Sequence, residues 1–262
     1  MRAALSLMLL ALLPMVVQAQ PDSVFIEDLT WPEVQTAIAD GTTTAIYYAG
    51  STEQNGPHMA LGKHNFIAYY VAGRIAEELG NALVYPILPF APTGDRSKKT
   101  GHMKFPGTVS LSDATFGAVA REVALSAISA GFKNVVLMGD HGGGQDALKQ
   151  VAADLDQEWG AKDAHVYYIP DPYYKTQELV RDYLLEHGLV VGRHAGIHDT
   201  SEVMFLDEDQ RWIRKDQLAL GNESNGVDGD PRQASPELGK VFLDIKINSA
   251  IAQISSLVTR SR

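Results

Sequence analysis

The histidines of this 262-residue chain gather beside carboxylates in three short windows. These windows are residues 50–64, 139–145 and 194–202, and each holds an aspartate or glutamate. Imidazole and carboxylate together suit borderline divalent ions such as zinc, manganese and iron. Spacing alone leaves a metal site and a set of unrelated polar side chains equally open. Of the eight histidines in the chain, five lie in the three windows: His58, His64, His141, His194 and His198.

Each window also has a purely structural interpretation. A lone histidine is most often a hydrogen-bonded polar group, and Gly142 to Gly144 could be a tight turn or an anion-binding nest at a helix start. Asp199, Thr200 and Ser201 could simply cap a helix. The metal hypothesis is favoured because all three windows are expected at one edge of a sheet.

Strand and helix patterns alternate along the chain and predict that sheet. Short β-branched or wholly apolar runs indicate strands, and apolar residues at helical spacing ended by glycine indicate helices. Repeated β-α units predict an α/β fold, a three-layer sandwich with a mainly parallel sheet between helices. The first two windows follow predicted strands, where ligands bind in open α/β sheets. The predicted strands are 43–48, 82–88, 135–138 and 165–169, and the predicted helices are 65–79, 113–130, 145–159, 173–187 and 236–258.

Composition excludes several functions. The chain has no cysteine, which rules out disulfides, thiol nucleophiles and cysteine-ligated zinc. Its formal net charge is −10, with 32 acidic and 22 basic residues. An acidic chain without basic clusters predicts that neither nucleic acid nor an anionic membrane is a partner.

The N-terminus has the pattern of a secretory signal peptide, residues 1–19. Arg2 precedes an apolar run, and small residues end at Ala19. A transmembrane anchor is the alternative, but the run is shorter than the ~20 residues that span a bilayer. No later segment is expected to be apolar enough to span one. The predicted mature protein is a single domain, residues 20–262, exported and periplasmic, with no membrane association after cleavage.

Five ordered motifs make the chain similar to the creatininase family. The family patterns are G-S-x-E-Q-H-G-P-H-L-P-L-x-x-D at residues 50–64, E-H-x-x-F-P-G-T at 101–108, N-G-H-G-G-N at 139–144, H-A-G-x-x-E-T-S at 194–201 and G-V-x-G-D-P at 226–231. The resemblance covers essentially the whole mature chain. It implies a layered α/β fold, a site for one or two divalent metals, hydrolysis of an amide or cyclic amide C–N bond, and a homo-oligomer, often a hexamer.

The resemblance also assigns residues, and this chain departs from the family at several of them. Glu53 and His141 match metal ligands, Asp199 matches an acidic position, and His194 matches a histidine near the reacting substrate. Three ligand positions differ: Asn55 replaces a histidine, His64 replaces a bridging aspartate, and Gly143 replaces a glutamate that binds metal in creatininase itself.

These departures predict one metal ion rather than two. An imidazole has one lone pair for one metal, so His64 cannot bridge two ions as a carboxylate does. We expect Glu53, His64 and His141 to hold the ion, with Asp199 or Asn55 adding an oxygen. Zinc is the first expectation, with manganese or iron as alternatives.

The expected reaction is attack of metal-activated water on the carbonyl of a small-molecule amide. His194, or failing it His198, is expected to pass the proton to the leaving nitrogen, with Asp199 beside them. His58 and His102 are interpreted as structural or as supporting the ligands.

Three other functions remain open from the sequence. The chain could be a creatininase-like peptidase or deformylase, since family identity does not select the amide. The altered ligand positions could instead mark a non-catalytic exported binding protein. A sugar- or lactone-directed hydrolase is supported only by the tyrosines near the fourth strand, Tyr167, Tyr168, Tyr173 and Tyr174.

Overall fold

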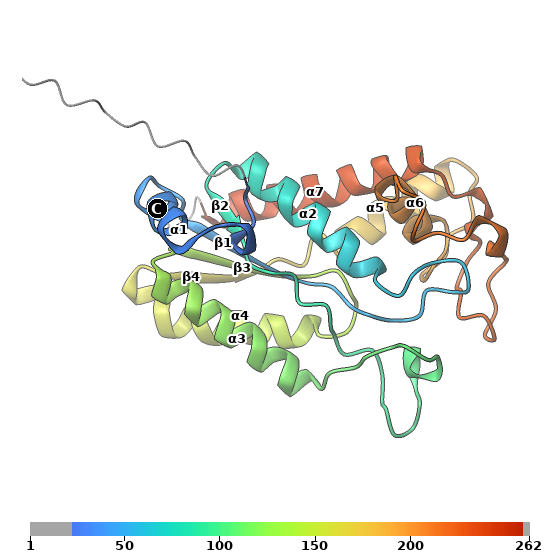
Figure 1. Cartoon of the computed structure of the whole chain (residues 1–262), viewed down its shortest axis with the longest axis horizontal. Helices are drawn as coiled ribbons and strands as arrows, with labels where there is room; N and C mark the ends of the chain where they lie inside the picture. The colour runs from blue at the N-terminus through green and yellow to red at the C-terminus, as the bar shows by residue number, and fades with distance from the viewer. Residues whose placement is uncertain (1–22, 259–262) are drawn as a thin grey trace, which may run out of the picture.

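The computed structural model describes residues 23–258, and their centre is a four-stranded parallel sheet. The strand order is β2-β1-β3-β4 (Figure 1). β1 and β3 pair along their whole length, from Thr44 opposite Asn134 to Ala49 opposite Gly139. The strands are β1 (Thr44–Ala49), β2 (Ala82–Val84), β3 (Asn134–Gly139) and β4 (His165–Tyr168).

Helices cover both faces of the sheet and make three layers (Figure 1). One core packs α2, α6 and α7 on one face, and the other packs α1, α3 and α4 on the opposite face. The α/β sandwich expected from the sequence is therefore confirmed. The α-helices are α1 (Trp31–Ala39), α2 (Lys63–Leu79), α3 (Asp113–Ala130), α4 (Gln145–Trp159), α5 (Tyr174–Glu186), α6 (Ile197–Leu206) and α7 (Pro236–Val258). Short 3-10 helices are Ile26–Asp28, Gly101–Lys104, Gly160–Lys162, Lys215–Gln217 and Pro231–Gln233.

The second strand is shorter than the apolar run 82–88 predicts. β2 ends at Val84, although the N–H of Tyr85 still donates to the carbonyl of Ile46 at 2.9 Å. Pro86 has no N–H and cannot continue the ladder. The chain rejoins β1 only at Leu88, whose N–H donates to Tyr48.

Two helices, α1 and α6, are absent from the sequence prediction. α1 starts with a capping box. The side chain of Thr30 accepts from the backbone N–H of Glu33, and the carboxylate of Glu33 accepts from the backbone N–H of Thr30. α6 begins after Gly196, so Asp199 lies in its first turn rather than at its cap. α6 buries Thr200, Ser201 and Glu202. Because its buried face is polar, its sequence does not show the apolar spacing from which a helix is predicted.

α7 corrects the expectation that no later segment could span a membrane. By length and composition it is apolar enough to do so. In the structure it packs against α2, α5 and α6 and buries Lys246 in an ion-pair network. Those contacts are typical of the core helix of a globular domain.

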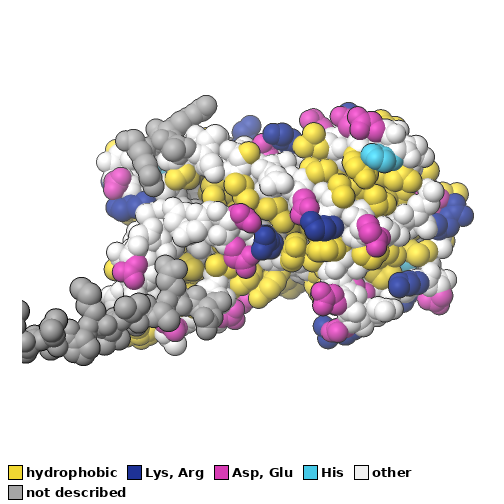
Figure 2. All heavy atoms as spheres, turned by 90° about the horizontal axis from the view of Figure 1, so that it is seen from above, with side chains coloured by type: hydrophobic (Ala, Val, Ile, Leu, Met, Phe, Trp, Pro, Cys, Tyr) yellow, Lys and Arg dark blue, Asp and Glu magenta, His cyan; other side chains and the backbone are white. Residues whose placement is uncertain are grey.

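The outer face on the side of α2 and α7 carries apolar side chains between scattered charges (Figure 2). The proposed signal peptide, residues 1–19, lies outside the described residues. The single-domain boundaries and the homo-oligomer remain predictions.

Candidate metal centre

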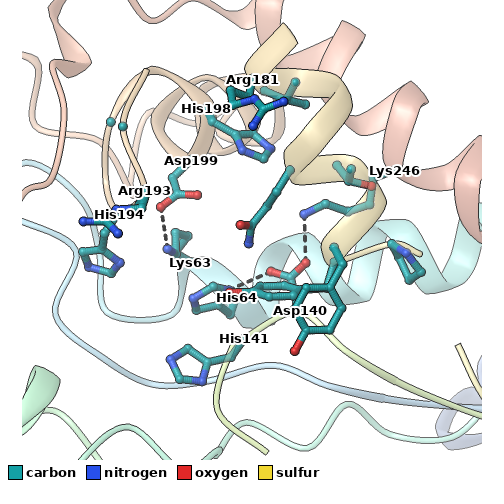
Figure 3. A pocket seen from close by; sticks show the side chains of 18 of the residues that line it. Lys63, His64, Asp140, His141, Arg181, Arg193, His194, His198, Asp199 and Lys246 are labelled. Carbon is teal, nitrogen blue, oxygen red and sulfur yellow. Dashed lines mark hydrogen bonds and ion pairs between the residues drawn. The ribbon is translucent and has the colours of Figure 1, made fainter. Parts of the chain in front are cut away.

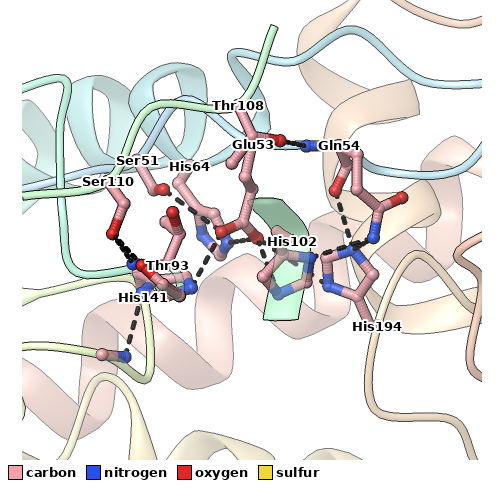
Figure 4. A network of polar contacts seen from close by, with 12 residues as sticks. Ser51, Glu53, Gln54, His64, Thr93, His102, Thr108, Ser110, His141 and His194 are labelled. Atoms are coloured by element: carbon pink, nitrogen blue, oxygen red, sulfur yellow. Dashed lines mark hydrogen bonds and ion pairs between the residues drawn. The ribbon is translucent and has the colours of Figure 1, made fainter. Parts of the chain in front are cut away.

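The centre of the site is one buried carboxylate surrounded by four histidines (Figure 4). Glu53 lies in the loop after β1 and is fully buried. Its Oε1 atom is 3.0 Å from Nε2 of His64, and its Oε2 atom is 2.8 Å from Nε2 of His141. Oε1 is also 3.8 Å from Nε2 of His102 and 3.8 Å from Nδ1 of His194. Residues far apart in the sequence thus converge at the carboxyl ends of β1 and β3.

Three of these residues form a set of donors that could hold one metal ion. The donor atoms of Glu53, His102 and His141 all lie within 4.8 Å of one another. His102 comes from the 3-10 helix Gly101–Lys104, in the long loop between β2 and α3. From the sequence, His102 is interpreted as structural or as supporting the ligands. The motif at residues 101–108 was the signal that could have placed it in the site.

His64 lies beside this triad but has other partners. Its Nδ1 is 2.7 Å from Oδ2 of Asp140, while its Nε2 faces Glu53. Although burial and Lys63 lower the pKa of His64, the charge of Glu53 and bonds to Asp140 and Glu53 raise it overall. An imidazole that donates from both nitrogens has no lone pair for a metal. In this geometry His102, not His64, completes the donor set.

The remaining residues expected at the metal also have other partners. The side-chain amide of Asn55 donates to the carbonyls of Glu53 at 2.9 Å and Ala60 at 3.1 Å, which shapes the loop that carries Glu53. Asp199 accepts from Nζ of Lys63 and from the N–H of Ala195, each at 2.7 Å. Neither residue belongs to the donor triad.

Of the two histidines expected to move a proton, His194 is the one near the triad. Its Nε2 donates to the backbone carbonyl of Gln54 at 2.9 Å, which leaves Nδ1 facing Glu53. Burial, together with the charge of Lys63, lowers the pKa of His194 to about 3. His198 lines another part of the same pocket, with Nε2 3.2 Å from Oε1 of Glu202.

A buried ion-pair network supports the centre from α7 (Figure 3). Nζ of Lys246 is 2.8 Å from Oδ1 of Asp140 and 3.2 Å from Oε2 of Glu202. Asp140 then bonds His64, which bonds Glu53. Lys246 is not recognised from the sequence, because a lysine in a largely apolar helix gives no sign of its distant partners.

Charge within this cluster explains why its acids stay ionised. Burial raises the pKa of Glu53, but His64 and the bond from His141 hold it well below its usual value. Burial likewise opposes ionisation of Asp140, whose pKa is lowered overall by Lys246 and His64. Ionised carboxylates and imidazole nitrogens are donors that suit borderline divalent ions.

Gly143 leaves no room for any side chain. The N–H of Gly143 donates to Nδ1 of His141 at 2.9 Å and fixes that ring. A Cβ at this position would overlap the backbone carbonyl oxygen of Pro92. The structure therefore agrees with the inference that position 143 supplies no ligand.

We expect Gly143→Ala to lower the free energy of unfolding by about 1–3 kcal/mol, as overpacking a dense site does. Urea unfolding would measure the change. Gly160→Ala is the matched control, because its Cβ would meet its nearest neighbours at 3.5 Å or more. Equal stability of both variants would contradict the crowding at Gly143.

The centre opens into a pocket of about 520 Å³. The triad, His194 and Lys63 line it together with Tyr173, just before α5, and with Gln177 and Val180 of α5. Such a volume is within the usual range for small-molecule sites. The pocket therefore has space for a substrate that extends beyond the amide group being hydrolysed.

Comparisons with known proteins agree on one family. The creatininase profile, described as creatinine amidohydrolase, matches residues 27–254. The chain is 34% identical over 119 residues to the creatinine amidohydrolase of Pseudomonas putida, covering 45% of each chain. It is 29% identical over 191 residues to the mycofactocin precursor peptide peptidase of Mycolicibacterium smegmatis, covering 71% of this chain and 66% of that one. These alignments thus span about half to two thirds of the curated relatives.

A solved structure shows the same fold. A mutant creatininase of the Zn-Zn type superposes with a TM-score of 0.74 at 23% identity, over 90% of this chain and 98% of that one. The agreement extends over nine tenths of this chain and shows that the two proteins share a fold.

Proposed function

This chain belongs to the creatininase family, and from that premise we propose that it is a metal-dependent hydrolase of an amide C–N bond. The observation that carries the proposal is the donor triad Glu53, His102 and His141 at the floor of a pocket. One carboxylate and two imidazoles match catalytic zinc sites that keep a further position open for water. Zinc is the proposed ion, and solved creatininases are named for both zinc and manganese.

Charge in the cluster favours a single ion. Its four carboxylates outnumber its two lysines by two, so one divalent ion would leave it neutral. A second ion would add two uncompensated charges to a buried site, which is costly. The carboxylates are Glu53, Asp140, Asp199 and Glu202, and the lysines are Lys63 and Lys246.

The chain's own residues divide the remaining tasks. A divalent ion held by the triad would lower the pKa of water toward about 7 and polarise a carbonyl. Burial lowers the pKa of His194 to about 3, so the ring is neutral and a weak base at pH 7. We assign to its Nδ1, which faces Glu53, the transfer of a proton to the leaving nitrogen without its storage on the ring. Gln54 orients that ring by accepting from Nε2 on its carbonyl.

A peptide-like amide is the second candidate substrate. The pocket volume of about 520 Å³ and the likeness to a peptide peptidase both favour it over a small cyclic amide. Assays with creatinine and with a set of short peptides would distinguish the two. A protein that holds metal but hydrolyses neither class would match the alternative of a binding protein.

We expect the purified wild type to bind close to one zinc ion per chain, and His102→Ala and His141→Ala to bind far less. Removing one of three ligands leaves too few donors to hold the ion. Metal analysis after zinc loading and desalting measures the ratio. His165→Ala is the control, because His165, the first residue of β4, pairs with Asp156 of α4, away from the triad.

Two outcomes would contradict this assignment. Full zinc content in His102→Ala, with loss in a His64→Ala variant, would return the ligand place to His64. No bound metal in the wild type, even after supplementation with zinc, manganese or iron, would refute the hydrolase proposal itself.

The location and assembly are proposals from the sequence. The N-terminal pattern supports export to the periplasm, and the family supports a homo-oligomer. Apolar side chains exposed on the outer face, Leu179 and Leu185 of α5 among them, are surfaces that such subunit contacts would bury.

A further inference from the structure

Lys63 is a buried lysine whose place in the fold is unfavourable for a positive charge. Its side chain is 1% exposed, and it is the first residue of α2. The N-terminal end of a helix carries the positive end of the helix dipole, which disfavours a cation. Burial of an ammonium costs further free energy. Neither local structure nor packing accounts for a lysine here.

The ammonium of Lys63 has more donors than partners. It carries three N–H groups, yet among the described residues its one hydrogen bond goes to Oδ2 of Asp199, at 2.7 Å. Lys246, the other buried lysine of the cluster, has two carboxylate partners. Lys63 also lines the pocket that holds the triad. Its remaining N–H groups are therefore available to an atom that enters the pocket.

Asp199 fixes this ammonium at the side of the pocket (Figure 3). The same Asp199 oxygen accepts the N–H of Ala195, so the carboxylate is anchored to the chain just before α6. Although burial lowers the pKa of Lys63, Asp199 and Glu53 raise it overall, and the group stays charged. A preorganised cation is the kind of donor that stabilises charge developing in a transition state.

We propose that Lys63 is a catalytic residue that binds the substrate's carbonyl oxygen and stabilises it as an oxyanion. This inference rests on the proposed amide hydrolysis. The oxygen of water forms a bond to the carbonyl carbon, and the carbonyl electron pair moves to the oxygen held by Lys63. The C–N bond then breaks, the nitrogen takes the proton that the attacking water gave up, and the carbonyl re-forms as a carboxylic acid. Lys63 keeps its proton throughout.

A carboxylate anion tests this oxygen site without the natural substrate. We expect the zinc-loaded full chain to bind trifluoroacetate at pH 7, measured by ¹⁹F NMR titration. Lys63→Met should weaken that binding about tenfold or more, as loss of a hydrogen bond between charged groups does. Asp199→Asn keeps the ammonium and should change the affinity by less than about threefold.

The two variants separate an oxyanion role from a merely structural ion pair. Equal loss of affinity in both variants, or no loss in Lys63→Met, would overturn the proposal. If Lys63→Met does not fold, the double variant Lys63→Met/Asp199→Asn removes both charges together and takes its place in the titration. Zinc content is measured on every sample, so failure of the metal site is seen separately from failure of Lys63.

Discussion

Replacing Lys246 with methionine is expected to lower the free energy of unfolding by about 3–5 kcal/mol, the usual cost of breaking a buried ion pair. Lys246 is 5% exposed and bonds both Asp140 and Glu202. Methionine fills a similar volume but leaves two buried carboxylates without their cation. Urea unfolding at pH 7 of the zinc-free protein measures this loss apart from metal binding.

Lys240→Met is the matched control on the same helix. Lys240 pairs with Asp244 at 2.7 Å, but both side chains are at least half exposed. Exposed pairs contribute little, so this variant should stay within about 0.5 kcal/mol of the wild type. A loss of unfolding free energy below about 1 kcal/mol in Lys246→Met would contradict the prediction. It would show that the charges of Asp140 and Glu202 are neutralised without Lys246.

The sequence predicts most of the sheet because buried parallel strands leave a simple signal. The middle of β3, residues 135–138, is an uninterrupted apolar run, and both β1 and β3 are buried along their whole length. α6 escapes prediction because its buried face carries Thr200, Ser201 and Glu202. Those buried residues are polar and lie beside the site. The sequence of α6 therefore lacks the apolar periodicity that a helix normally shows.

The site is predicted in part, for a related reason. Glu53 and His141 follow β1 and β3, and strand order alone brings them to one edge. His102 arrives on a long loop whose path no local pattern specifies. Lys63 pairs with Asp199, and Lys246 pairs with Asp140 and Glu202, all distant in sequence. Such pairs depend on tertiary packing, and a single sequence does not show them.

The chain should also lose stability in mild acid because of His58. This side chain is fully buried, and burial lowers its pKa to about 4 from an ordinary value of about 6.5. Its Nε2 donates to Oγ1 of Thr200 at 3.0 Å, whose hydroxyl in turn donates to the carbonyl of Ala195. Nδ1 has no hydrogen-bond partner among the described residues. Protonation would therefore bury a charge and an unpaired donor.

The sign of the effect follows from proton binding. Between pH 6.5 and 4 the unfolded chain binds a proton at His58 that the folded chain does not, so stability falls as pH falls. Above about pH 6.5 the titration of His58 does not lower the free energy of unfolding. By pH 4 it has lowered that free energy by about 3 kcal/mol. Glutamine can donate to Thr200 but does not titrate. In urea unfolding of zinc-free protein, wild type should therefore lose about 3 kcal/mol more than His58→Gln between pH 7 and 4. Parallel pH profiles for the two proteins would show that His58 is already charged when folded, and that its buried Nδ1 has a partner in solution.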